Sequence, residues 1–501
     1  MQKERHILIL QLIVFLSILI LVAMSACGRD IFVNNVKGND DWDGSREKPF
    51  MTLDRAVNEL RTSDTLYLVP TGFPYKWLSP SPQNRIRVGG TPEKHLVIDG
   101  QGTEITAFRR YGSESWKNEG NGVFSMPLNS NSWMRDGWWE GFDLVFFDGQ
   151  PGKNCKLKAK LVPYGYVWFS SRLHDKNKAD AALATLYIML PEGKTPDDIS
   201  VETGSPYSIL PIESNYVTVK NLKVTWSWHD GFSSVFSKEI VYENVEAAYN
   251  MDQGMSHHSS VVIVRNSHFH HNAGAGIVDV RMNSKSTAES TYENCLIEND
   301  TYRGGVEFHD GVYRMKNCII RNNKGDAVLI VNNPSLFPDN TKAFFENCLF
   351  EGGGAIVVRD SCSAEFINCT FYRQEEKSYS GQGLIFGIRA LNSRIFQCAF
   401  INSPNIFSLP KITPGAVFSI DYNCYGEGLI TVDNVRYQIP ADLEKYRKET
   451  GLDEHSFYRK IKLEGSPYTL PELQGNGKDG ADIGAHLNLE RFNQYLNGQK
   501  K

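Results

Sequence analysis

The feature that most constrains the fold is a short unit that recurs seven times between residues 217 and 371. Each unit is a strand of alternating apolar and polar residues that ends in asparagine and is followed by a second short strand, as in STYENCLI and YRMKNCII. The asparagines recur every 21 to 30 residues, at Asn221, Asn244, Asn266, Asn294, Asn317, Asn347 and Asn368. Repeats of this length, with strands and no helices, predict a solenoid whose strands stack in parallel sheets.

Stacking of the repeats predicts two columns of identical side chains. Each asparagine should lie about 4.8 Å from the next, so that the side-chain amides can form a hydrogen-bonded ladder at the turn. The position after the asparagine becomes cysteine in four coils, and a fifth cysteine fits one coil later: Cys295, Cys318, Cys348, Cys369 and Cys398. We expect these thiols to fill the interior as small apolar side chains, because in-line stacking explains all five without a disulfide or a metal.

Composition and the N-terminus indicate the class of protein. The 501 residues are 41% hydrophobic, enough to bury a core, and the net charge of −5 without a dense basic cluster argues against a nucleic-acid partner.

Lys3 and Arg5 precede the apolar run Ile7–Met24, which indicates an export signal. Its ending, Ser-Ala-Cys27, resembles a bacterial lipobox, which implies lipidation of Cys27. The alternative is an uncleaved membrane anchor. We expect a monomer outside the cytoplasm, tethered to a membrane at the cell surface or in the periplasm.

The repeats resemble the right-handed parallel β-helix, the fold of pectate lyases and many polysaccharide-degrading enzymes. Residues 31–70, with the loop GNDDWDG and the run KPFMTL, resemble the N-terminal segment of extracellular bacterial β-helix proteins. That resemblance implies a capping helix near Met51–Leu60. Gly465–His486 resembles the closing segment of the same proteins. The expected fold class is therefore all-β, a solenoid with a short capping helix.

The repeat rhythm fails between Gly112 and Thr203. Strand-like runs such as LVFFDGQPG and ATLYIMLPEGKTPDD, with Asp-Gly and Pro-Glu-Gly turns, predict a small inserted antiparallel β-domain. This insert resembles those of certain β-helical glycoside hydrolases, including β-xylosidase and α-fucosidase/xylanase families. The expected division of the chain is a lipoprotein signal peptide at 1–26, a cap with the first coils at 27–111, the insert at 112–203, coils carrying the active groove at 204–437, and a C-terminal helix and closing segment at 438–501.

Acidic and histidine side chains gather in the second half of several coils. A glycine or alanine there is followed by an apolar residue that we expect to point inward: Phe232, Met255, Ile277, Val306 and Val328. Alternation then predicts an outer face with Asp230, Asp252, His258, Glu307 and His309. His257 and Asp279 have the opposite parity, and the pattern leaves open whether they lie inside or at a bend.

The spacing of coils suits glycoside hydrolysis. This reaction uses two carboxyl groups, about 5 Å apart in retaining enzymes and about 6.5–9.5 Å apart in inverting ones. Acids one or two coils apart meet these distances. The candidate catalytic acids are Asp230, Asp252, Asp279 and Glu307, of which we favour the first two. The alternative is that they only form turns, since aspartate before glycine is a common turn former and Asp326 occupies an equivalent position.

Aromatic and histidine residues on the same coils predict contacts to a poly- or oligosaccharide. The expected substrate contacts are Trp228, His229, His257, His258, Arg281 and His309, with the rings of Trp226 and Tyr249 nearby. We expect no metal at His268, His270 and His271, because one strand does not offer the geometry of a zinc site.

Three other functions stay open. A polysaccharide lyase would use Arg281 or Arg303 as its base, and only this function would call for Ca²⁺ as a cofactor. A C5-epimerase is less favoured, because Asp252-Gln253-Gly254 lacks the Pro-His-Asp of the epimerase DPHD site. A non-catalytic glycan-binding protein would keep the aromatic and hydrogen-bonding groups without an acid pair.

Overall fold

The computed structural model describes residues 28–77, 85–128, 145–155, 157–170, 184–204, 208–227, 229–301, 304–337, 341–372, 383–387, 390, 392–411, 417–463, 468–492 and 495. The expected signal peptide and Cys27 lie outside these residues. Within the described ranges, no helix has the length and apolar character needed to cross a membrane.

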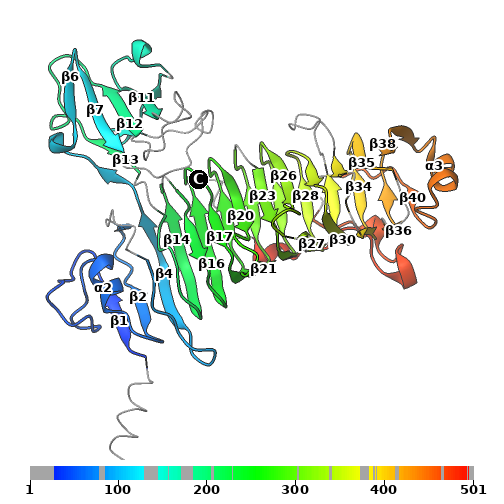
Figure 1. The fold of residues 1–501 in the computed structure, drawn as a ribbon, viewed down its shortest axis with the longest axis horizontal. Coiled ribbons are helices and arrows are strands. Elements are labelled where there is room, and N and C mark those ends of the chain that lie inside the picture. The colour runs from blue at the N-terminus through cyan, green and yellow to red at the C-terminus, as the bar shows by residue number, and fades with distance from the viewer. Residues whose placement is uncertain are drawn as a thin grey trace, which may run out of the picture.

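The described chain winds into a long solenoid with two parallel sheets along its length (Figure 1). We call them sheet A and sheet B. Sheet A begins each coil with β1 (Asp30–Val33), β2 (Thr65–Leu68), β4 (Leu96–Thr106), β14 (Val217–Thr225), β16 (Ile240–Ala248), β18 (Val261–Arg265), β21 (Glu289–Glu293), β24 (Val312–Lys316), β27 (Thr341–Glu346), β30 (Cys362–Ile367), β33 (Ser393–Phe396) and β36 (Phe418–Asp421).

After a bend, sheet A continues with β3 (Tyr75–Lys76), β19 (His268–His270), β22 (Leu296–Glu298), β25 (Ile319–Arg321), β28 (Leu349–Glu351), β31 (Thr370–Tyr372), β34 (Ala399–Ile401), β37 (Cys424–Tyr425) and β40 (Phe457–Tyr458). Sheet B consists of β15 (Phe232–Val235), β17 (Met255–His258), β20 (Ala275–Val280), β23 (Gly304–His309), β26 (Asp326–Val331), β29 (Ile356–Val358), β32 (Leu384–Phe386), β35 (Asn405–Leu409), β38 (Gly428–Val432) and the antiparallel β39 (Val435–Ile439).

The asparagines make the bend within sheet A, and the predicted ladder is confirmed. All seven have positive φ values between 50° and 53°, the left-handed conformation that asparagine tolerates better than most residues. Their side chains bond from coil to coil: Asn294 Nδ2 donates to Asn266 Oδ1 at 3.2 Å, and Asn347 Nδ2 donates to Asn317 Oδ1 at 2.7 Å. The bend thus recurs in register along the solenoid.

The interior is filled by stacked rows of apolar side chains. The inward row predicted for sheet B is confirmed, since the residues from Phe232 to Val328 pair in register and are fully buried. The five repeat cysteines are also buried and free, as predicted. Rings of Phe350, Phe371 and Phe400 stack on successive coils at 5.1 and 4.5 Å. The core is thus a continuous column rather than a single cluster.

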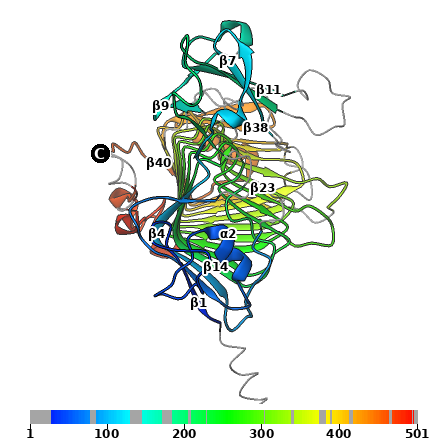
Figure 2. The same cartoon turned by 90° about the vertical axis from the view of Figure 1, so that its left-hand side faces the viewer.

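The insert stands beside the N-terminal end of the solenoid (Figures 1 and 2). Its strands are β5 (Arg109–Arg110), β6 (Lys117–Gly120), β7 (Val123–Leu128), β8 (Val145–Phe147), β9 (Gln150–Pro151), β10 (Lys153–Asn154), β11 (Gly165–Ser170), β12 (Ala184–Met189) and β13 (Val201–Thr203). They form two small sheets that are mostly antiparallel. The expected antiparallel fold of this region is confirmed.

Both ends of the solenoid carry a short helix. The N-terminal helix α2 (Leu53–Glu59) lies inside the predicted range, and Thr52 caps it by accepting from the Arg55 amide. At the other end lies α3 (Leu443–Thr450). The chain then returns along the outer face of sheet A, where Leu470, Leu473 and Ile483 belong to an apolar cluster with Leu296 and Ile319. This return segment ends, among described residues, at Tyr495.

Candidate functional site

Two aspartates and a histidine meet at the turns that lead into β15 and β17. One nitrogen of His229 and one oxygen each of Asp230 and Asp252 lie within 4.8 Å of one another. The glycine after Asp230 permits this close approach of coils, because a Cβ on Gly231 would lie 2.6 Å from the carbonyl oxygen of Gly254. The structure therefore brings together the two carboxylates favoured by the sequence.

Hydrogen bonds hold the His229 ring against the deeper carboxylate. His229 Nδ1 lies 2.8 Å from Asp230 Oδ2 and 3.0 Å from Ser208 Oγ. Asp230 is fully buried, and its Oδ1 has no hydrogen-bond partner among the described residues. His229 and Asp252 are partly exposed, so these two groups form the accessible side of the cluster.

The electrostatics keep a proton in this cluster. Burial lowers the pKa of His229, but the charge and hydrogen bond of Asp230, together with the charge of Asp252, outweigh burial and raise that pKa to about 9. The imidazole is therefore protonated at neutral pH and lies between two acids. Such an arrangement offers both a mobile proton and a carboxylate at one place.

The insert borders the cluster. Met251, one residue before Asp252, and Ala273 on the next coil are buried in the same apolar cluster as Phe124 and Val145 of the insert. The inserted domain therefore packs against the coils that carry the acids. Any substrate at Asp252 lies close to the junction of the two parts.

The other outward candidates lie along sheet B. His258 on β17 and His309 on β23 occupy one outward row, two coils apart, with Val280 between them. His258 Nε2 lies 3.1 Å from Ser256 Oγ, and His309 Nε2 lies 3.3 Å from Glu307 Oε2. Glu307 and His309 thus form a second acid–histidine pair on the face predicted by the sequence.

Two candidates face the interior instead. Ser234, His257 and Asp279 stack in register on three coils, and each is buried. Ser234 Oγ lies 2.7 Å from His257 Nδ1, and Asp279 Oδ2 accepts from the hydroxyl of Tyr292 at 2.9 Å. Because a sugar on the outer face of sheet B cannot reach these groups, we leave His257 and Asp279 out of the site.

Arg281 and two aromatic residues near the cluster contact neighbouring parts of the protein. Arg281 donates to the carbonyl oxygens of Ser284 and Ser286, so its guanidinium holds the loop after β20. Trp226 and Tyr249 stack on each other at 5.2 Å, with 11° between their planes. Each ring thus has one face covered by its neighbour. Trp228 and Arg303 lie outside the described residues.

Sequence reasoning missed two polar neighbours of the cluster. Ser208 contacts His229 from 21 residues earlier in the chain, and Gln253 donates to Asp252 Oδ1. Gln253 sits in the MDQG turn and was visible there as an amide next to the acid. Ser208 belongs to no motif, and only the path of the chain brings it to the cluster.

Comparison with known proteins decides the handedness of the solenoid. A model of the right-handed β-helix region matches residues 207–371. These residues match a right-handed β-helix region, and the parallel sheets of the solenoid extend beyond them in both directions. This confirms the right-handed parallel β-helix that the repeats resemble. A search of curated proteins gives no significant match.

Solved structures similar to this β-helix include three carbohydrate-active proteins. One is a glycoside hydrolase, at 10% identity over 82% of this chain and 95% of the other, with a TM-score of 0.45. The pectate lyase Pel9A shows 10% identity over 76% and 77% of the chains, with a TM-score of 0.41. The GH136 lacto-N-biosidase from Eubacterium ramulus shows 11% identity over 86% and 67%, with a TM-score of 0.42. None of these scores reaches 0.5, so the fold assignment rests on the strands and the family model.

Proposed function

We propose that this β-helix is a glycoside hydrolase that acts at His229, Asp230 and Asp252. The observation that carries the proposal is the approach of the two carboxylates, with oxygens within 4.8 Å of each other, around a histidine whose pKa is raised to about 9. In retaining glycosidases the nucleophile and the acid/base group lie about 5 Å apart, and here one nitrogen of His229 and one oxygen of Asp252 lie within 4.8 Å of each other.

The exposures of the three groups suggest their roles. Asp252 is partly exposed and acts as the nucleophile, whose oxygen attacks the anomeric carbon of the sugar. The protonated His229, held by Asp230, gives its proton to the leaving oxygen as the glycosidic bond breaks. Water then hydrolyses the glycosyl ester on Asp252, and its proton returns to His229. Asp230 is the positioning residue that keeps the imidazole charged.

A panel of poly- and oligosaccharides tests the proposal when two products are measured together. Hydrolysis releases a reducing end without ultraviolet absorbance, whereas lyase action creates an unsaturated, absorbing product. We expect reducing ends only, and no effect of EDTA on the rate. Absorbing product, or glycan binding without turnover of any substrate, would overturn the hydrolase proposal in favour of a lyase or a binding protein.

Variants test the assignment of residues. Asp252→Asn should lose at least about 10³-fold in kcat, because the nucleophile is absent. Asp326→Asn is the matched control, since Asp326 begins β26 of sheet B, three coils from the turn that carries Asp252. Full activity in Asp252→Asn, with thermal unfolding like that of wild type, would rule out this nucleophile.

We also propose export and lipidation at Cys27, on the strength of the lipobox-like ending of the apolar run. Growth of the expressing bacterium with a labelled fatty acid should label the wild-type chain and leave Cys27→Ala unlabelled. Equal labelling of both chains would reject Cys27 as the acceptor.

A further inference from the structure

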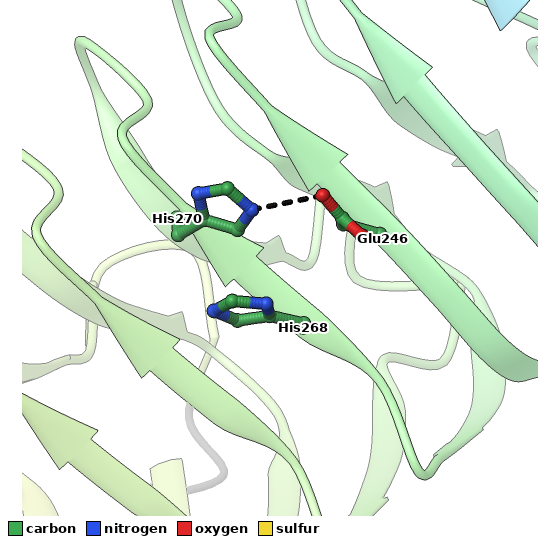
Figure 3. A group of neighbouring side chains, drawn as sticks. All are labelled: Glu246, His268 and His270. Carbon is green, nitrogen blue, oxygen red and sulfur yellow. Dashed lines mark hydrogen bonds and ion pairs between the residues drawn. The ribbon is translucent and has the colours of Figure 1, made fainter. Parts of the chain in front are cut away.

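A second cluster of ionisable side chains lies on the outer face of sheet A. Glu246 on β16 pairs in register with His268 on β19, and His270 follows two residues later on the same face. One donor atom from each of the three lies within 4.8 Å of the others. The two imidazole rings stack with centroids 4.0 Å apart, and both are buried (Figure 3). Three groups from two coils therefore converge on one place.

One nitrogen of each imidazole is held by a side chain outside the cluster. His268 Nε2 lies 2.9 Å from Glu298 Oε1, and Glu298 is itself held by Arg321 at 2.7 Å. His270 Nδ1 lies 2.8 Å from His271 Nδ1. These bonds leave His268 Nδ1 and His270 Nε2 for the cluster. Histidines that bind metals usually have the second nitrogen held in this way, by a carboxylate or another polar group.

Within the cluster, His270 Nε2 lies 3.0 Å from Glu246 Oε1. Metal ions bind the neutral imidazole and the ionised carboxylate, so an ion in the cluster would take the place of the proton between these two groups.

We propose that Glu246, His268 and His270 form a binding site for a divalent transition metal ion, for which Zn²⁺ is the best match. Two imidazole nitrogens and one carboxylate are a usual Zn²⁺ ligand set that leaves a fourth position for water. A site made only of carboxylate and carbonyl oxygens would instead select Ca²⁺ or Mg²⁺.

The surroundings indicate a structural role for the ion. The ring of Tyr495, at the end of the return segment, lies 4.9 Å from that of His268, and the Tyr495 hydroxyl donates to the carbonyl oxygen of Asn266. An ion here ties two coils together beneath the return segment. The inference is independent of the hydrolase proposal, because none of these residues belongs to the His229 cluster.

Lys223 is the natural competitor of the ion. Its Nζ lies 2.8 Å from Glu246 Oε1, and its side chain is 34% exposed. A bound cation repels this ammonium group, which can turn outward to solvent. Removal of the lysine charge should therefore strengthen metal binding, an effect that a purely structural hydrogen-bond network would not produce.

Titration of the folded, EDTA-treated and dialysed chain with Zn²⁺, followed by calorimetry, tests the proposal on protein without a polyhistidine tag. We expect one ion per chain and a rise of several degrees in Tm. His270→Asn and the isosteric Glu246→Gln should each weaken binding at least about 100-fold, and Lys223→Met should tighten it several-fold. His455→Asn, at an exposed histidine paired with Asp421 far along the chain, is the matched control and should bind as wild type does.

Co²⁺ identifies the ligands by their absorption. Ligation by histidine and carboxylate gives only weak visible bands, whereas an intense near-ultraviolet band would report cysteine thiolates. Absence of binding in both wild type and Lys223→Met would overturn the proposal. So would a thiolate band, or unchanged affinity in a folded Glu246→Gln or His270→Asn chain, because each would place the ion elsewhere.

Discussion

The hydroxyl of Tyr292 donates a hydrogen bond of 2.9 Å to Asp279 Oδ2 inside the solenoid, where both side chains are buried. This bond satisfies only half of the carboxyl group. Asp279 Oδ1 and the nearby His257 Nε2 have no hydrogen-bond partner among the described residues. Burial raises the pKa of Asp279 to about 7, although the neighbouring hydroxyl groups of Ser290 and Tyr292 oppose the rise.

The first prediction concerns stability and pH. A carboxyl group whose pKa is about 7 when folded and about 4 when unfolded binds more protons in the folded state, so stability falls as pH rises from about 4 to 7. Asp279→Asn keeps the acceptor for Tyr292 and cannot ionise. We expect its Tm to exceed that of wild type more at pH 8 than at pH 5. The same difference at both pH values would show that Asp279 is not the titrating group.

The second prediction concerns the alkaline limb of activity. Since His229 has a pKa of about 9, wild-type kcat should fall as pH rises through about 9 and the imidazole loses its proton. His229→Gln should reduce kcat by about 10²–10⁴-fold and abolish this limb. His258→Gln, on the same outer face, should keep the limb. A wild-type limb that survives in His229→Gln would assign the proton to another group.

The third prediction separates two contributions of the asparagine ladder. Asn294 has a φ of 53° and both accepts from Asn317 and donates to Asn266. Asn294→Gly should lose the ladder bonds alone, about 1 kcal/mol, because glycine adopts positive φ freely. Asn294→Ala should lose about 1–2 kcal/mol more. Urea unfolding measures both, and equal losses would show that the backbone conformation contributes nothing.

The fourth prediction concerns the eight described cysteines, all of which are free and buried. Burial raises the pKa of the Cys362 and Cys424 thiols to about 12, and thiols react as thiolates. In the native protein we expect almost no reaction of these eight with a disulfide reagent over an hour, and complete reaction in concentrated urea. The control is Cys27→Ala, which removes the one cysteine outside the described residues. Rapid reaction of any of the eight in the native protein would contradict its burial.

Much of the fold was predictable from local patterns. Equivalent positions of successive repeats stack on one another, so the spacing of the repeats predicts the register of the strands. Asn266 and Asn294 mark the same bend on successive coils, and the residue parity after each glycine correctly predicted the buried row from Phe232 to Val328. The same register explains why Asp230 and Asp252, one coil apart in the sequence, meet in space. The parity of His257 and Asp279 was also visible, but it did not show whether that row faced inward.

Local patterns are sufficient to predict the parallel solenoid, its ladder and its column of cysteines, because each depends on contacts between equivalent positions of neighbouring coils. Which polar side chains share a site depends instead on the three-dimensional path of the chain. Ser208 reaches His229 through the path of the chain, and Glu246 joins His268 and His270 although 22 and 24 residues separate it from them. A single strand does not offer a metal geometry, but two adjacent strands do, since side chains on one face of neighbouring coils lie about 4.8 Å apart.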